Sequence, residues 1–359
     1  MKVIYDKIQF FGGAERVLLQ INKSLNPTKI ATLCYVKNPP MEEIRKKIIY
    51  PKWGFLFKKF KFFAIFYPFV CFLCSFYKVD DNLVFCYSSS NGKFFNIRAK
   101  KKILYTNFPA RGIVEPEKFV KNKILLILLK FFIYFFKKYE SIQYRKFDKI
   151  YCISNYTKDL LLRHYDVKSS VIYCPTSELF FSKKFVNNSK KDFFVLVSRI
   201  ENHKNLEFVL ETFSKINEKL IVLGTGSLLN KFSNKYPKIK FKGYVTDEEM
   251  IQIISSSKAS IIPTKNEYSM PIIESFARGT PVISINCPAA YELVLSLSKL
   301  KGINLGITFE KPSVNSLKKA INRFNKNQKN YRSNEIKNFS KIFSPSYFDA
   351  KIKKIISDI

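Results

Sequence analysis

Acidic residues and histidine are scarce in this 359-residue chain. It has 28 Asp and Glu against 62 Lys and Arg, a formal net charge of +34, and only two histidines. We see no cluster of acidic or imidazole side chains at metal-ligand spacing, so we expect no metal site. The basic excess leaves three partners open: nucleic acid, an anionic membrane surface or phosphorylated substrates. Coding bias that enriches Lys, Asn, Ile, Phe and Tyr together would also produce it, with the lysines forming a solvated surface.

The chain also lacks a disulfide framework and a recognisable leader. Its seven cysteines are odd in number and scattered, which favours a reducing compartment. Cys71 and Cys74 form a CxxC without two further ligands nearby, so an apolar helix face is favoured over a zinc site. Asp6 and Gly12-Gly13 interrupt the first apolar residues, and we therefore expect no signal peptide and a cytoplasmic protein.

No apolar run is long enough to predict a membrane span. The charge-free run Phe62–Tyr77 is too short and contains Pro68, and the aromatic segment Lys121–Lys138 is interrupted by Lys130. The first run is preceded by Lys52, Lys58, Lys59 and Lys61. Apolar faces rimmed by lysine are typical of helices that lie in the interface of an anionic membrane. The alternative is that both segments are core helices of the N-terminal domain.

Apolar segments of strand and helix type alternate along the whole chain. Hydrophobic residues make up 47% of it, which excludes disorder, and the length predicts two domains. Alternating strands and helices indicate parallel α/β sheets. We predict a first domain over residues 1–182, a second over 183–335, and a C-terminal helix within 336–359 that packs back on the first. The predicted strands are Lys2–Tyr5, Ile30–Val36, Leu83–Tyr87, Lys102–Thr106, Lys149–Ile153, Ser170–Tyr173, Phe193–Val197, Lys219–Leu223, Lys238–Lys242, Ala259–Ile262 and Thr280–Ile285.

Glycine is rare, with 11 in the chain, yet six glycines fall at predicted strand ends or tight turns. Such positions allow a backbone to approach a ligand at the carboxyl ends of parallel strands. The six are Gly12, Gly13, Gly224, Gly226, Gly243 and Gly279.

Four segments of the second half occur in an order that resembles a known family. They are SRIENHKN (198–205), GTG (224–226), FKGYV (241–245) and PTKNEYSMPIIESFARGTPVI (263–283). Together they resemble the retaining glycosyltransferase family 4, of GT-B fold. Weaker matches lie at residues 12–16, 105–111 and 148–175. The resemblance implies two Rossmann-like domains whose parallel sheets face across a cleft, with a nucleotide-sugar bound by the C-terminal one.

Two cations follow the predicted strand Phe193–Val197. Arg199 and Lys204 would stand at the carboxyl end of that strand, where a diphosphate would sit. A leaving nucleoside diphosphate gains charge as the glycosidic bond breaks, so fixed cations favour the transition state. We therefore assign both residues to catalysis.

Pro271 is suited to the first turn of a helix, and Tyr268–Ile272 can then offer backbone N–H groups to phosphates. By resemblance, Glu274 would hold the ribose diol and Glu267 the donor sugar. The family's two glutamates are usually one residue further apart. Either one residue is missing between Glu267 and Pro271, or Asn266 occupies the first position. The prolines on both sides align in type, which favours the missing residue and keeps Glu267 as a catalytic residue.

The resemblance implies further substrate-binding positions in both halves. They are Gly12, Gly13, Asn107, Arg111, Gly224, Gly226, Tyr244, Val245, Ser269, Met270, Pro271, Ile272 and Glu274. Asn107 stands where members often carry His, and Asn cannot act as a general base.

The resemblance thus implies a glycosyltransferase that needs no cofactor beyond its nucleotide-sugar donor. It would act with retention on a lipid-linked or glycan acceptor at the cytosolic membrane face. Two alternatives are a non-catalytic nucleotide-sugar binder, suggested by Asn107 and the short glutamate spacing, and a basic nucleic-acid-binding protein. No nucleic-acid-binding module is recognisable, which disfavours the last.

Overall fold

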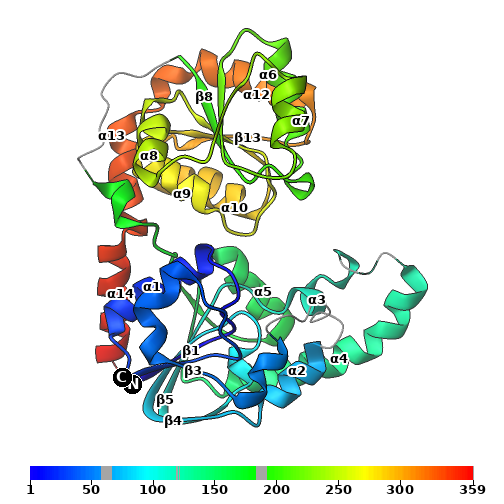
Figure 1. Ribbon diagram of the computed structural model, residues 1–359, viewed down its shortest axis with the longest axis vertical. Coiled ribbons are helices and arrows are strands. Elements are labelled where there is room, and N and C mark those ends of the chain that lie inside the picture. The colour runs from blue at the N-terminus through cyan, green and yellow to red at the C-terminus, as the bar shows by residue number, and fades with distance from the viewer. Residues whose placement is uncertain (58–66, 119, 121, 183–191, 359) are drawn as a thin grey trace. The chain divides into compact units, whose positions relative to one another are not determined.

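The computed structural model describes residues 1–57, 67–118, 120, 122–182 and 192–358 (Figure 1). The chain forms two compact units. Unit 1 comprises Met1–Pro175 and Phe348–Ile359, and unit 2 comprises Thr176–Tyr347. The first unit therefore ends seven residues before the predicted boundary at Ser182. The predicted lysines 58, 59 and 61 lie outside the described residues.

Unit 1 is built on a seven-stranded parallel sheet with the order β3-β2-β1-β4-β5-β6-β7. Its strands are β1 (Lys2–Tyr5), β2 (Lys29–Ala31), β3 (Ile48–Ile49), β4 (Lys78–Tyr87), β5 (Asn96–Thr106), β6 (Lys149–Cys152) and β7 (Ser170–Val171). The helices that follow the strands cover the sheet, and α1 (Gly13–Leu25) buries Val17, Leu18 and Ile21 on one face. β4 and β5 are longer than predicted, whereas β2 ends at Ala31.

Unit 2 has a six-stranded parallel sheet with the order β10-β9-β8-β11-β12-β13. Its strands are β8 (Phe194–Val197), β9 (Leu220–Leu223), β10 (Lys240–Gly243), β11 (Ser260–Ile262), β12 (Val282–Ile285) and β13 (Gly306–Phe309). Its helices include α6 (Glu207–Lys215), α7 (Leu229–Lys235), α8 (Asp247–Ser256), α9 (Met270–Ala277), α12 (Val314–Lys326) and α13 (Ser333–Phe339). β8, β11 and β12 are almost wholly buried, as expected for central strands covered on both faces.

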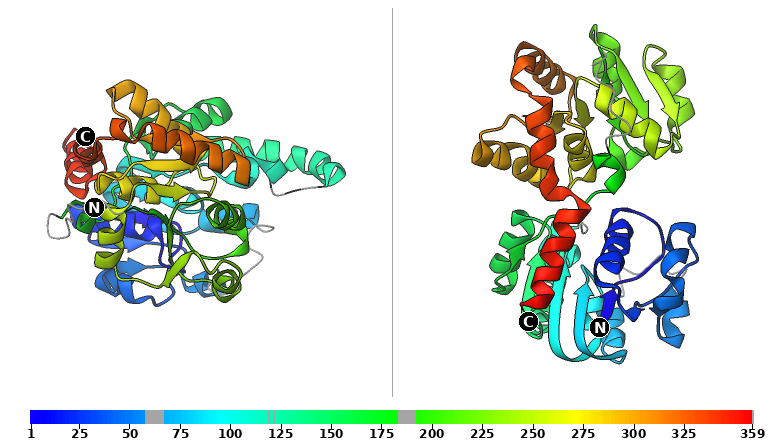
Figure 2. Two further views of the ribbon diagram at one scale, coloured as in Figure 1. Left: turned by 90° about the horizontal axis from the view of Figure 1, so that it is seen from above. Right: turned by 90° about the vertical axis from the view of Figure 1, so that its left-hand side faces the viewer.

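The last helix, α14 (Pro345–Ser357), begins in unit 2 and continues into unit 1 (Figure 2, right). Within unit 1, the buried Phe348 ring lies 5.8 Å from the Tyr105 ring. Asp349 accepts a hydrogen bond from Gln20 of α1 at 2.8 Å and another from Ser24. Residues far apart in sequence thus complete the same core.

The CxxC lies on α2 (Tyr67–Cys74), and both thiols are buried and free. They belong to the hydrophobic core of unit 1, and burial raises the pKa of each. No group of three or more potential metal ligands occurs among the described residues.

Candidate functional site

The strand order in the sheet of unit 2 changes direction between β8 and β11. Their chain neighbours β9 and β12 lie on opposite sides of this pair. In open α/β sheets, ligands bind outside the carboxyl ends of the strands at such a point. A pocket of about 210 Å³ lies there. It is lined by Val197, Ser198, Arg199, Lys204, Ile261, Ile262, Pro263, Thr264, Asn266, Ser269 and Pro271.

Backbone contacts between two loops fix the position of Arg199. Ser198 N–H donates to Leu223 at 3.0 Å, and Ile200 N–H donates to Thr225 at 2.9 Å. A Cβ on Gly224 would come within 2.1 Å of the Ser198 carbonyl oxygen, and one on Gly226 within 2.3 Å of the Ile200 carbonyl oxygen. Gly224 also has φ +126°, which disfavours any side chain. These glycines therefore let the loop after β9 pack directly against the loop that carries Arg199.

A carboxylate further ties the two loops together. Glu201 accepts hydrogen bonds from the backbone N–H of Ser227 at 3.0 Å and from its hydroxyl at 2.7 Å. The hydroxyl and backbone hydrogen bonds lower the pKa of Glu201. The acidic residue nearest to Arg199 in sequence is thus occupied with the second loop.

Two cations border the pocket. Among the described residues, no acceptor pairs with the side chain of Arg199 or Lys204. Burial lowers the pKa of Lys204, and the charge of Arg199 lowers it further. Because each positive charge raises the free energy of the other, an anion bound between them would be stabilised by both.

The amino end of α9 meets the same pocket. Its first turn contains Pro271, and the preceding Ser269 makes no capping hydrogen bond with its side chain. Ser269 is only 2% exposed, and its hydroxyl has no hydrogen-bond partner among the described residues. A buried hydroxyl without a partner is costly, and helix N-termini favour anions. The pocket therefore combines two cations, an unused hydroxyl and a helix amino end.

Neither of the two predicted glutamates lines this pocket. Glu274 is a buried residue in the second turn of α9. Glu267 is not among the lining residues, whereas its neighbour Asn266 is. The carbonyl of Asn266 accepts a hydrogen bond from Ala289 N–H at 3.1 Å, which holds this segment against the next loop. Asn266 is thus a lining residue that the favoured alignment left out.

The other residues predicted in unit 2 do not line the pocket. Met270 and Ile272 belong to α9, with Ile272 fully buried. Tyr244 and Val245 follow β10, and the Tyr244 side chain is 81% exposed. Their contact with substrate remains a prediction.

The residues predicted in unit 1 lie after β1 and after β5. Gly12 precedes α1 and Gly13 begins it. Asn107 donates to the Tyr87 hydroxyl at 2.9 Å, and its side-chain oxygen is buried without a hydrogen-bond partner among the described residues. Arg111 begins α3 (Arg111–Val114), and its guanidinium lies over the Phe108 ring at 5.1 Å. Their roles toward an acceptor also remain predictions.

Asp6 organises this end of unit 1, and no sequence motif predicted that role. Its carboxylate accepts hydrogen bonds from the N–H groups of Ser89, Ser90 and Gly92 at 2.7 to 2.9 Å, and from the Ser88 hydroxyl. It thereby fixes the loop after β4 against the end of β1.

The chain is similar to one protein family and to several solved structures. Residues 178–341 match the family model "Glycosyl transferases group 1". No curated protein matches the chain. Among the solved structures that are similar over nearly the whole chain, three illustrate the match. An Anabaena protein, Alr3699/HepE, in complex with UDP has a TM-score of 0.68 at 15% identity and full coverage of both chains.

The second structure is the lipopolysaccharide outer core galactosyltransferase WaaB, with a TM-score of 0.64 at 15% identity and full coverage of both chains. The third is a glycosyltransferase from Rickettsia africae, with a TM-score of 0.65 at 18% identity, covering 99% of this chain and 98% of that one. The chain therefore has the GT-B fold, and its residues 178–341 match the glycosyl transferases group 1 model.

Proposed function

We propose that this protein is a glycosyltransferase that uses a nucleoside-diphosphate sugar and belongs to the retaining family 4. The observation that carries this is the pocket at the carboxyl ends of β8 and β11. There Arg199 and Lys204 have no counterion among the described residues, next to the amino end of α9. The Alr3699/HepE structures, which contain UDP or UDP-glucose, support a uridine diphosphate donor.

The proposed reaction uses charge that develops on the donor. The bond between the sugar's anomeric carbon and the diphosphate oxygen breaks, and the electron pair stays on that oxygen. Arg199 and Lys204 stabilise the developing negative charge, with the N–H groups of α9 as fixed dipoles. These groups replace a metal ion in that role. The acceptor hydroxyl bonds to the same face of the anomeric carbon, and its proton passes to the leaving phosphate.

Glu274 would hold the ribose diol, and Glu267 would bind the donor sugar together with its neighbour Asn266. This mechanism needs no protein base, which is consistent with Asn107 in place of a histidine. The acceptor is a glycan or a lipid-linked molecule at the cytosolic face of a membrane.

The test is donor hydrolysis and transfer measured with UDP- and GDP-sugars. Replacing Arg199 or Lys204 with Ala should lower turnover by about 10²- to 10³-fold, as the loss of a preorganised transition-state donor does. Lys319→Ala, at an exposed residue of α12 outside the pocket lining, is the matched control and should keep wild-type turnover. A loss of tenfold or less in both pocket variants contradicts the assignment. Nucleotide-sugar binding without any turnover would instead show a non-catalytic binder.

A further inference from the structure

Helix α4 (Lys123–Arg145) exposes an unusual number of large apolar side chains. Eight of the residues between 124 and 135 are 47% to 72% exposed. They are Ile124, Leu125, Ile127, Leu128, Phe131, Phe132, Tyr134 and Phe135. Single exposed apolar residues are ordinary, but a contiguous cluster of this size marks an interaction surface.

The exposed residues share one side of the helix. At about 100° per residue, these eight positions cover roughly half of the helix circumference. Lys123, Lys130 and Lys137 are seven residues apart and therefore form one row along the border of that apolar half. This combination of a broad apolar face with a lysine border is typical of a helix that lies in a membrane interface.

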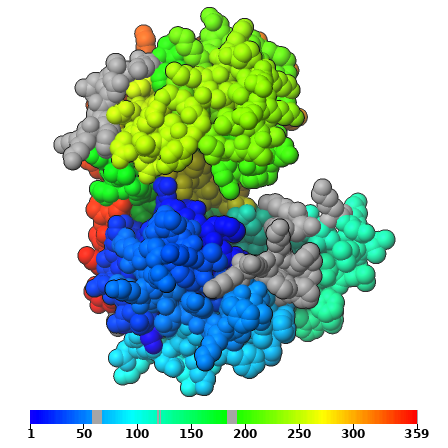
Figure 3. All heavy atoms as spheres, in the orientation of Figure 1, coloured from blue at the N-terminus to red at the C-terminus, as the bar shows by residue number. Residues whose placement is uncertain are grey.

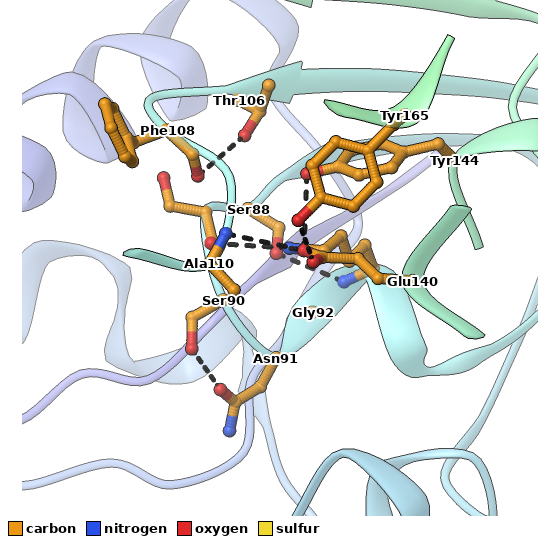
Figure 4. A network of polar contacts seen from close by, with 12 residues as sticks. Ser88, Ser90, Asn91, Gly92, Thr106, Phe108, Ala110, Glu140, Tyr144 and Tyr165 are labelled. Atoms are coloured by element: carbon orange, nitrogen blue, oxygen red, sulfur yellow. Dashed lines mark hydrogen bonds and ion pairs between the residues drawn. The ribbon is translucent and has the colours of Figure 1, made fainter. Parts of the chain in front are cut away.

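The other end of α4 is fixed in the core of unit 1. Glu140 forms an ion pair with Lys93 at 2.9 Å, and both side chains are fully buried. Glu140 also accepts hydrogen bonds from Tyr165 at 2.5 Å and Tyr144 at 3.4 Å (Figure 4). The apolar first half of α4 extends away from this anchor and from the body of unit 1 (Figures 1 and 2). The exposed face therefore lies on the half of α4 that projects from the anchored half.

The neighbouring helix α2 and the turn after it add three exposed aromatic rings. They are Phe69 and Phe72 of α2 and Phe76 of the turn. The two helices are in contact, since the Tyr67 ring of α2 lies 5.6 Å from the Phe136 ring of α4. The space-filling view shows α4 standing out from the surface of unit 1 (Figure 3).

The charge of this region distinguishes between possible occupants. Six lysines and no acidic residue lie between Glu117 and Glu140. A second copy of the chain would bring two such lysine sets together, and like charges in contact are unfavourable. An anionic lipid surface supplies the opposite charge to the lysines and hydrocarbon to the apolar face.

We propose that the first half of α4, with its apolar face and its lysine border, docks unit 1 onto an anionic lipid bilayer. The contact would give the enzyme access to an acceptor held in the membrane. In this respect the inference rests on the proposed function. The helix lies in the interface and does not cross the bilayer. In the described part of the chain, no helix has both the length and the apolar character needed to span a membrane.

The experiment is sedimentation with vesicles of phosphatidylcholine alone or with about 30% phosphatidylglycerol, at low and high salt. Wild-type protein should bind the anionic vesicles and bind neutral ones poorly. Phe131→Gln, Phe132→Gln and Phe135→Gln combined keep the charge and helix propensity, and should weaken binding by at least about 100-fold. The matched control replaces three exposed apolar residues elsewhere with Gln, namely Leu162, Tyr291 and Leu300, and should bind as wild type.

A second variant isolates the electrostatic part. Lys123→Gln, Lys130→Gln and Lys137→Gln together should weaken binding by about fivefold for each lysine. Its control removes the same charge from unit 2 through Lys318, Lys319 and Lys326 of α12, all exposed. Circular dichroism checks that each variant is folded.

The proposal is overturned if the wild-type protein does not bind anionic vesicles. It is also overturned if the variant with Phe131, Phe132 and Phe135 replaced binds them as well as wild type. Self-association that the aromatic variant abolishes, without any effect on vesicle binding, assigns the face to a second copy and also overturns it. A thermal shift with UDP-sugar, measured without vesicles, reports on the proposed function separately.

Discussion

Removing the carboxylate of Glu140 should destabilise unit 1 strongly. Glu140→Gln leaves the Lys93 ammonium buried without its counterion, and breaking such a pair costs about 3–5 kcal/mol. Lys93 keeps a hydrogen bond to the Ser89 carbonyl at 3.3 Å and contacts with the Phe94 and Tyr144 rings at 5.4 and 5.3 Å. These contacts offset part of the cost, so we expect the lower end, about 3 kcal/mol. For a domain of this size, that lowers Tm by about 6–12 °C.

Unit 1 can be followed on its own, because the chain has a single tryptophan. Trp53 packs against Phe57 and the core of unit 1, so its fluorescence during urea unfolding reports on that unit. The matched control is Glu42→Gln, which removes the exposed pair between Arg45 and Glu42 and should cost at most about 1 kcal/mol.

A double variant tests the cause of the destabilisation. Lys93→Met with Glu140→Gln removes the buried charge, while the glutamine oxygen can still accept from Tyr165. It should therefore be more stable than Glu140→Gln alone. Two results would contradict this cause: a free energy of unfolding of Glu140→Gln within about 1 kcal/mol of the wild-type value, or a double variant no more stable than Glu140→Gln alone.

Three predictions concern unit 2. Glu274→Gln should weaken nucleotide binding by about 1–3 kcal/mol, because a charge-assisted bond to the ribose becomes neutral, and calorimetry with free UDP measures it. Unchanged affinity for UDP would show that Glu274 does not bind the ribose and only packs within unit 2. Activity should survive EDTA, because Arg199 and Lys204 take the place of a metal, and loss of turnover that Mg²⁺ or Mn²⁺ restores would contradict this. Gly226→Ala should cost about 1–3 kcal/mol and lower activity, since its Cβ would clash with the Ile200 carbonyl and displace the loop carrying Arg199. Wild-type stability by circular dichroism and wild-type turnover would show that the loops relax freely.

The α/β alternation could be predicted because apolar runs such as Phe194–Val197 and Val282–Ile285 are buried central strands. The short edge strands β3 and β13 were missed, since two or four residues with partial burial carry little pattern. In the pocket, Arg199, Lys204, Ser269 and Pro271 were predicted as neighbours.

What the sequence could not show depends on contacts between distant residues. Asp6 binds a loop more than eighty residues later, and nothing near it in sequence marks that role. Which of Asn266 and Glu267 lines the pocket depends on the path of the backbone through this loop, and residue types alone do not determine that path. For α4, the core alternative holds for its second half, which is buried, whereas its first half is exposed and its contact with a membrane stays a prediction.

Helix α14 has a consequence for synthesis of the chain. Unit 1 is completed by Phe348 against Tyr105 and by Asp349 against Gln20 and Ser24. During synthesis on the ribosome, the first segment of unit 1 emerges before unit 2. It remains without α14 until all of unit 2 has been made, roughly 10–30 s at about 5–20 residues per second. Unit 2 is continuous in sequence and so has all its residues available before unit 1 does. The domain encoded first is therefore the last that can reach its final structure, and until then the surface that α14 covers is open to chaperones.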